Sequence, residues 1–192
     1  MQSLIDHARA HGQRPEDFAA LAAGQSPQAL FITCSDSRVV PALITGARPG
    51  ELFELRTAGN IVPPYPSDRP TGEAATIEYA VNVLGVTDVV VCGHSHCGAV
   101  GALVRGDDLT AVPAVRAWLA QAAPRPSGPP EDPSVAEAVQ SHVLTQLLRL
   151  RAYPCVADKA ANGTLRLHAW FYEVDTGTVR EHRPDTDTFE AL

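Results

Sequence analysis

Two short segments contain residue types that bind borderline metal ions. Residues 34–38 read CSDSR and offer a thiol, a carboxylate and a guanidinium, and residues 93–98 read GHSHCG and offer two imidazoles and a second thiol. Two thiolates and an imidazole form a ligand set for tetrahedral zinc, which prefers sulfur and nitrogen donors. Each segment alone is a weak signal, because a buried cysteine or a histidine near a helix start usually serves packing. Together they predict a zinc site.

The spacing in the second segment favours one of its two histidines. His94 and Cys97 are three residues apart, so both side chains can face one point in a tight turn or a first helical turn. His96 comes immediately before Cys97 and would normally point elsewhere. We therefore expect Cys34, His94 and Cys97 to hold one zinc ion per chain.

Asp36 and Arg38 are two residues apart and carry opposite charges. Residues two apart share a face of an extended segment, so a bidentate carboxylate–guanidinium pair is within reach. If Arg38 holds Asp36, the metal keeps an open position; if the pair breaks, Asp36 could become a fourth ligand in an inactive, closed state. Closed zinc sites are structural and open ones are catalytic. The competing interpretation is an ordinary surface ion pair, worth about 0–1 kcal/mol.

Both segments follow runs that are typical of buried parallel strands. Residues 29–33 are continuously apolar apart from the final threonine, and residues 86–92 are mostly β-branched with Asp88 as their only charge. In open α/β sheets the carboxyl ends of the strands border the ligand crevice. We therefore expect the two segments to meet at one edge of a sheet.

The rest of the chain alternates between strand and helix patterns. We expect a strand over 51–55, helices over 71–84 and 99–104, a long helix from a Ser134/Glu137 capping box to about Arg151, and a strand over 165–174 followed by a turn at 175–177. Gly85 is the expected C-cap of the helix over 71–84. The pattern predicts an α/β fold with a mostly parallel β-sheet flanked by helices and a C-terminal antiparallel edge hairpin.

The first 24 residues are expected to form an N-terminal helical arm, with one helix starting at Pro15-Glu16-Asp17. We found no internal repeat and no second domain, so residues 1–192 are expected to form a single domain. The chain has 192 residues, of which 45% are hydrophobic and 19% charged, a globular composition.

Charge and hydropathy exclude several classes of partner and location. The formal net charge of -7 argues against binding to nucleic acid or to anionic lipid, and no run approaches the about 18 apolar residues of a membrane span. The N-terminus lacks the pattern of a secretory signal, so we expect a cytoplasmic protein. Four cysteines in that reducing compartment are expected to be thiols or ligands, with Cys92 and Cys155 in the core.

Other sites are not supported by the sequence. It has no Cys-x-x-Cys pair, no Gly-x-Gly-x-x-Gly loop and no Walker lysine, and no arginine closes a phosphatase-like loop after Cys97. The remaining histidines are expected to be surface or locally hydrogen-bonded side chains: His7, His11, His142, His168 and His182.

The two segments resemble the signature motifs of the β-class carbonic anhydrases, in particular the plant-type subclass. Flanking residues agree over nearly the whole chain: 24–27 (GQSP), 56–60 (RTAGN), 77–80 (IEYA) and 167–172 (LHAWFY). The resemblance implies that Cys34, His94 and Cys97 bind zinc and that Asp36 and Arg38 are the catalytic dyad.

The resemblance also implies a substrate pocket formed by Gln25, Phe53 and Tyr79, with Gln25 as a hydrogen-bond donor and the two rings as walls. In the family the active site forms at a dimer interface, so these three residues can serve the zinc ion of a partner subunit. The implied assembly is a homodimer or a dimer of dimers. His142 stands where the family often has asparagine.

The expected function is reversible hydration of carbon dioxide to bicarbonate and a proton, by attack of zinc-activated hydroxide. Two alternatives stay open at this point. Relatives that share the ligands hydrolyse carbon disulfide or carbonyl sulfide, and a non-catalytic zinc-binding or sensor protein would keep Asp36 on the metal.

Overall fold

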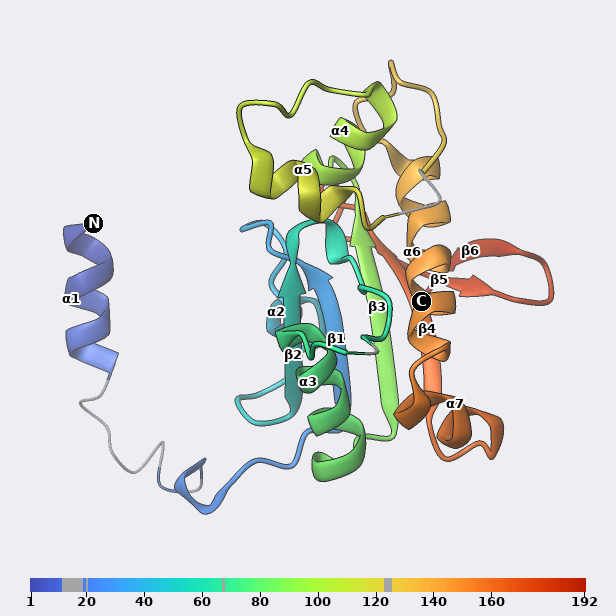
Figure 1. The fold of residues 1–192 in the computed structure, drawn as a ribbon. Helices are drawn as coiled ribbons and strands as arrows, with labels where there is room; N and C mark the ends of the chain where they lie inside the picture. The colour runs from blue at the N-terminus through green and yellow to red at the C-terminus, as the bar shows by residue number, and fades with distance from the viewer. Residues whose placement is uncertain (12–18, 20, 67, 123–125) are drawn as a thin grey trace.

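A six-stranded sheet forms the centre of the protein in a computed structural model that describes residues 1–11, 19, 21–66, 68–122 and 126–192 (Figure 1). The strand order is β2-β1-β3-β4-β5-β6, parallel from β2 to β4 and antiparallel from β4 to β6. The strands are β1 (Ala29–Cys34), β2 (Leu52–Thr57), β3 (Asp88–His94), β4 (Arg166–Tyr172), β5 (Val179–Arg183) and β6 (Thr188–Ala191).

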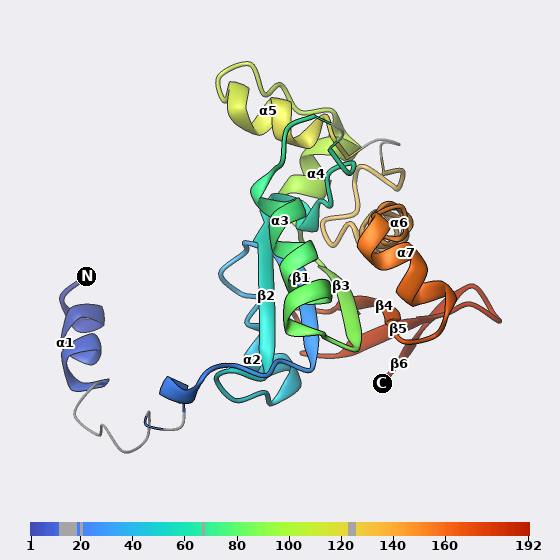
Figure 2. The same cartoon turned by 60° about the horizontal axis from the view of Figure 1, so that its bottom comes forward.

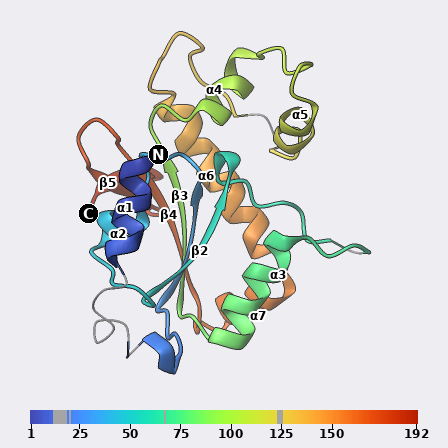
Figure 3. The same ribbon diagram turned by 90° about the vertical axis from the view of Figure 1, so that its left-hand side faces the viewer.

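Helices cover the sheet unequally. Figures 2 and 3 show α3, α6 and α7 on one side of the sheet and the short α2 on the other, while α4 and α5 lie beyond the carboxyl ends of the parallel strands (Figure 1). The helical segments are α1 (Gln2–His11), η2 (Leu21–Ala23), α2 (Pro41–Thr45), η3 (Ala58–Asn60), α3 (Gly72–Glu78), η4 (Tyr79–Leu84), α4 (Gly98–Arg105), α5 (Pro113–Leu119), α6 (Ala136–Arg151) and α7 (Pro154–Ala161).

The predicted α/β class and the mostly parallel sheet are confirmed. The predicted antiparallel hairpin forms between β4 and β5, but the chain then adds β6, which the sequence pattern did not reveal and which takes the sheet edge. The helix expected over 71–84 is α3 followed by a π-helical turn, η4, and Gly85 ends it in the left-handed region, with a φ of 69°.

The capping box predicted at Ser134 and Glu137 is wrong. The Ser134 hydroxyl donates to the Asp132 carboxylate, and Ser134 and Asp132 together accept from the Ala136 N–H at the start of α6. Val135 precedes the helix with a φ of 47° and caps nothing with its side chain. Asp132 binds at the start of α6 in place of the predicted capping box, because a carboxylate is a strong hydrogen-bond acceptor at a helix N-terminus.

Burial along the strands follows from their position in the sheet. The inner strands β1 and β3 are buried at every residue after the first, in keeping with the continuous apolar runs that predicted them. The last four residues of the edge strand β2 instead alternate, with Glu54 and Arg56 exposed and Leu55 and Thr57 buried. The larger core lies between the sheet and the layer of α3, η4, α6 and α7, and a smaller cluster of Phe31, Val90 and Cys92 lies on the opposite face.

Helix α1 buries none of its residues and stands apart from the sheet in Figures 1 and 2. Leu4 is 68% exposed and Ile5 is 37% exposed. The N-terminal helical arm is thus present at residues 2–11, whereas the helix start expected at residues 15–17 lies outside the described residues. No described helix has the length and apolar character needed to cross a bilayer.

Gly93 generates a stability prediction, because a Cβ at this position would lie 2.5 Å from Val139 Cγ1 and 2.6 Å from Val143 Cγ2 of α6. We expect Gly93→Ala to lower the free energy of unfolding by about 1–3 kcal/mol, through overpacking of β3 against α6. Urea denaturation checks this value. The control is Gly72→Ala, since a Cβ there meets no atom within 4 Å; equal losses in both variants would contradict the packing argument.

Candidate metal centre

The carboxyl ends of β1 and β3 bring the predicted zinc ligands together. Thr33 of β1 pairs with Cys92 of β3, so Cys34 ends its strand beside the segment that ends in His94. Cys97 follows one turn later, just before α4. One ligand atom from each of Cys34, His94 and Cys97 lies within 4.8 Å of the other two, and all three residues are buried.

The hydrogen bonds of His94 leave one ring nitrogen available to a metal. His94 Nδ1 lies 2.8 Å from the Ser95 carbonyl oxygen, which can only accept, so Nδ1 carries the proton. Nε2 then has a lone pair, is fully buried and has no hydrogen-bond partner among the described residues. A buried nitrogen of this kind is costly unless something binds it. The three residues therefore fit a zinc ion.

The pKa values of the two thiols shift in opposite directions. A hydrogen bond from the Cys97 thiol lowers the pKa of Cys34 to about 4, and the same contact raises the pKa of Cys97 above its usual value. The backbone N–H of Gly59 also donates to Cys34 Sγ, at 3.3 Å. Binding of a metal cation would release any proton held by either sulfur, because thiols bind metals as thiolates.

Arg38 holds Asp36 in the bidentate geometry that the two-residue spacing predicts. Arg38 Nε donates to Asp36 Oδ1 at 3.0 Å, Arg38 Nη2 donates to Oδ2 at 2.8 Å, and the Arg38 backbone N–H donates to Oδ1 at 2.9 Å. These bonds hold the pKa of Asp36 well below its usual range, mainly through the Arg38 side chain. Asp36 Oδ2 lies 3.9 Å from His94 Nε2, so the carboxylate borders the ligand group while Arg38 holds it.

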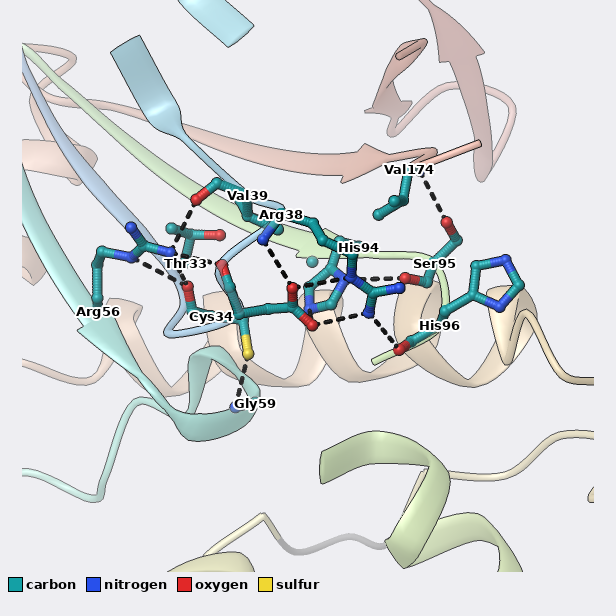
Figure 4. A network of polar contacts seen from close by, with 12 residues as sticks. Thr33, Cys34, Arg38, Val39, Arg56, Gly59, His94, Ser95, His96 and Val174 are labelled. Atoms are coloured by element: carbon teal, nitrogen blue, oxygen red, sulfur yellow. Dashed lines mark hydrogen bonds and ion pairs between the residues drawn. The ribbon is translucent and has the colours of Figure 1, made fainter. Parts of the chain in front are cut away.

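Arg56 organises the first segment, a role that sequence reasoning missed. Its guanidinium donates to three backbone carbonyls, those of Cys34, Asp36 and Val39, at 2.8–3.1 Å (Figure 4). The segment after β1 thereby gains partners for carbonyls that no strand satisfies. Arg56 is the penultimate residue of β2 and belongs to the 56–60 segment that resembles the family, but neither observation specifies backbone carbonyls as its partners.

His96 points away from the ligand group, as the spacing predicts. Its Nδ1 lies 2.9 Å from the Pro133 carbonyl oxygen and its Nε2 lies 2.8 Å from Asp175 Oδ2. Its backbone has a φ of 57°, and its carbonyl oxygen accepts from Arg38 Nη2 at 3.1 Å. Arg38 thus links the two segments through the His96 backbone.

Gln25, Phe53 and Tyr79 do not reach the ligand group of their own chain. Phe53 of β2 pairs with Leu30 of β1, and Leu30 lies four residues before Cys34 in that strand. Phe53 is therefore about 13 Å from Cys34, measured along the strand. The Phe53 and Tyr79 rings do lie together, 5.9 Å apart, and Tyr79 is 45% exposed. Gln25 is also exposed.

His142 is a further residue that sequence reasoning misplaced. It was expected as a surface or locally hydrogen-bonded side chain, but it is 1% exposed, and its Nε2 lies 2.8 Å from the Gly59 carbonyl oxygen, 83 residues away. Burial lowers its pKa. A polar residue on the apolar face of a long helix was the available signal, but it does not identify the partner.

Comparisons with known proteins agree with this geometry. The family model described as carbonic anhydrase matches residues 29–179. The chain belongs to the carbonic anhydrase family. It is 49% identical to a carbonic anhydrase of Pseudomonas aeruginosa over 190 residues, covering 93% of this chain and 86% of that protein. It is 42% identical to carbonic anhydrase 1 of Escherichia coli O157:H7, covering 100% and 92% of the two chains.

Solved structures identify the class. The β-carbonic anhydrase CcaA matches with a TM-score of 0.91 and 38% identity, over 100% of this chain and 99% of that chain. One of two tetrameric β-carbonic anhydrases from Sordaria macrospora matches with a TM-score of 0.75 and 31% identity, over 94% and 92% of the two chains. The family is one of zinc enzymes, and the Cys-His-Cys group of this chain is the place for that ion.

The geometry of the two histidines generates a prediction about metal content. We expect His94→Ala to abolish stoichiometric zinc binding, because it removes one of three ligands. His96→Ala is expected to retain about one zinc per chain, since both of its ring nitrogens are engaged outside the ligand group. Elemental analysis of the purified variants measures this difference, and equal zinc content in the two would contradict the ligand assignment.

Proposed function

We propose that this chain catalyses the reversible hydration of carbon dioxide to bicarbonate and a proton at the group formed by Cys34, His94 and Cys97. The observation that carries the proposal is the Arg38–Asp36 pair. Three hydrogen bonds from Arg38 hold the carboxylate beside the ligands, so that a metal bound there by three protein side chains keeps an open position for reaction.

Cys34, His94 and Cys97 would hold the zinc ion, which would supply hydroxide at neutral pH by lowering the pKa of water to about 7. Asp36, kept ionised beside the ligands, would accept a hydrogen bond from the O–H group of the nucleophile and so orient it toward carbon dioxide. Arg38 keeps Asp36 charged and fixed in orientation. One C–O bond forms at the carbon while the π bond of one C=O group breaks and its electrons move to that oxygen. One O–H bond of the water also breaks and its proton leaves to solvent, so that carbon dioxide and water give bicarbonate and a proton.

The same pair argues against a non-catalytic zinc protein. Such a protein would keep Asp36 on the metal as a fourth ligand, which requires the carboxylate to leave Arg38. Breaking a bidentate charge-assisted pair costs more than breaking a simple surface contact, because two parallel hydrogen bonds are lost together. The similarity of this chain to proteins named carbonic anhydrase also supports hydration of carbon dioxide, rather than hydrolysis of its sulfur analogues, as the proposed activity.

We also propose that the active site is shared between two copies of the chain, with Gln25, Phe53 and Tyr79 lining the partner's metal site. Phe53 and Tyr79 lie together but remote from Cys34 of their own chain. Val83, four residues after Tyr79 in η4, is an apolar side chain that is 65% exposed in the single chain. Helix α1, which buries nothing on its own chain, would pack on the second copy.

This surface supports a homodimer, and a dimer of dimers fits the tetrameric description of the Sordaria macrospora relatives.

The state of the cysteines supports a cytoplasmic location, which we propose for this protein. All four are free thiols: Cys34, Cys92, Cys97 and Cys155. Thiols of this kind persist in a reducing compartment.

The role of Asp36 is tested by Asp36→Asn. We expect this variant to bind about one zinc per chain and to lose at least about 100-fold in carbon dioxide hydration, measured by stopped flow, because an amide is a weaker acceptor and pairs poorly with Arg38. The matched control is Asp107→Asn, which disrupts the bidentate Arg105–Asp107 pair of the same two-residue spacing. Wild-type turnover in Asp36→Asn would remove Asp36 from the mechanism.

The shared site is tested by complementation. Cys34→Ser removes a metal ligand and Gln25→Ala removes the proposed donor, so each homodimer is expected to have little activity. A hybrid carrying one copy of each, selected with two different affinity tags, has one site with both wild-type contributions. We expect about half of the wild-type turnover per dimer. A hybrid as inactive as its parents would show that each site belongs to a single chain.

A further inference from the structure

We infer that the peptide group between Ala58 and Gly59 is a built support for the Cys34 sulfur, and that Trp118 and His142 are the residues that position it. The inference rests on Cys34 being a metal ligand, which is part of the proposed function. It adds the residues that hold the sulfur from outside the ligand group, and they come from α5 and α6, which contribute no ligand.

The Ala58–Gly59 peptide is bound at both of its ends. Its N–H, on Gly59, donates to Cys34 Sγ at 3.3 Å (Figure 4). Its carbonyl, on Ala58, accepts from the Trp118 indole N–H at 2.9 Å. A hydrogen bond at the carbonyl polarises the peptide and strengthens its N–H as a donor. Trp118 therefore acts on the sulfur through one intervening peptide group.

His142 fixes the next peptide along the chain. Its Nε2 donates to the Gly59 carbonyl at 2.8 Å, since that oxygen can only accept. Its Nδ1 is then an acceptor and faces Gln146 Nε2 at 3.4 Å, while Gln146 Oε1 accepts from the Val62 N–H at 3.0 Å. The tautomer of His142 and the orientation of the Gln146 amide are both determined by these fixed backbone partners.

Gly59 needs this support because its backbone is unusual. It has a φ of 72° and a ψ of 23°, in the left-handed region, and a Cβ there would lie 3.0 Å from Ala99 Cβ. Glycine permits the conformation but does not select it, because its backbone is the least restricted of any residue. Bonds from Trp118 and His142 to the two adjoining carbonyls select the one orientation in which the N–H points at Cys34.

A donor aimed at a thiolate has two effects on a bound metal. It stabilises the negative charge of the sulfur and it fixes the direction of its lone pairs. Outer partners of metal ligands typically change metal affinity by about 10–100-fold when they are removed. Weakening the Gly59 donor is therefore expected to speed metal release and to raise the electron density on Cys34.

The test replaces Trp118 by phenylalanine, which keeps an aromatic ring and removes the N–H donor. We expect Trp118→Phe to release zinc to a chromophoric chelator about tenfold faster than the wild type. In the cobalt(II)-loaded protein, the sulfur-to-cobalt charge-transfer band is expected to move to longer wavelength. The matched control is Trp170→Phe, because Trp170 is the other tryptophan of the chain and its indole N–H faces Glu181 on the sheet.

His142 supplies a second, independent pair of variants. His142→Phe removes the donor to Gly59 and is expected to show the same fast zinc release and the same shift of the cobalt band. His142→Gln keeps an N–H near the position of Nε2 and is expected to restore both. Tyr153→Phe controls for general loosening, since it deletes a buried side-chain bond to the same loop, at the Pro63 carbonyl.

Several outcomes would overturn the inference. One such outcome is that Trp118→Phe and His142→Phe release zinc within about twofold of the wild-type rate and show no shift of the cobalt band. The Ala58–Gly59 peptide would then not support the sulfur. Equal effects in Tyr153→Phe, or no restoration in His142→Gln, would show general loosening instead. These results differ from failure of the metal site itself, in which the wild-type protein would bind neither zinc nor cobalt.

Discussion

The parallel pairing of β1 with β3 is the constraint on which the rest of the structure depends. Two segments sixty residues apart in the chain become a ligand group only because their strands end at neighbouring positions of one sheet edge. That pairing is stabilised by burial of both strands, which is why they carry so few polar side chains. The missing side chain at Gly93 also contributes, because it lets α6 pack directly on β3 next to His94. The packing of α6 on β3 at Gly93 thus also fixes the position of the neighbouring ligand, His94.

Around the ligands, arginine side chains bind backbone carbonyls, which in the strands and helices are bound by other backbone groups. The segment after β1 is neither strand nor helix, so its carbonyls need other partners. Arg56 supplies them from β2, and Arg38 joins Asp36 to the backbone of His96. A planar guanidinium with five donors suits both tasks, because it can satisfy several fixed acceptors at once. Lysine, a point charge on a flexible stem, would not define the same geometry.

Local patterns in the sequence predicted those parts of the structure whose geometry is set by residues close together in the chain. The apolar run before Cys34, the three-residue spacing of His94 and Cys97 and the two-residue spacing of Asp36 and Arg38 each specify geometry within one segment, and the structure has that geometry. Arg56 and His142 were not predictable in the same way, because their partners are 17–22 and 83 residues away and are backbone groups with no sequence signature. Strand β6 lacked a strong alternating pattern, since Phe189 is its only residue that is not exposed.

The positions of the functional groups also separate metal binding from substrate binding. Cys34, His94, Cys97 and their hydrogen-bond partners all belong to one chain, and their geometry is complete in that chain. Phe53 and Tyr79 form an exposed pair about 13 Å along the sheet from that group. If a second copy supplies the substrate pocket, a single chain can bind the metal and still lack a catalytic site. The metal would then be retained by interactions inside the fold, whereas turnover would depend on the concentration of the chain through its assembly.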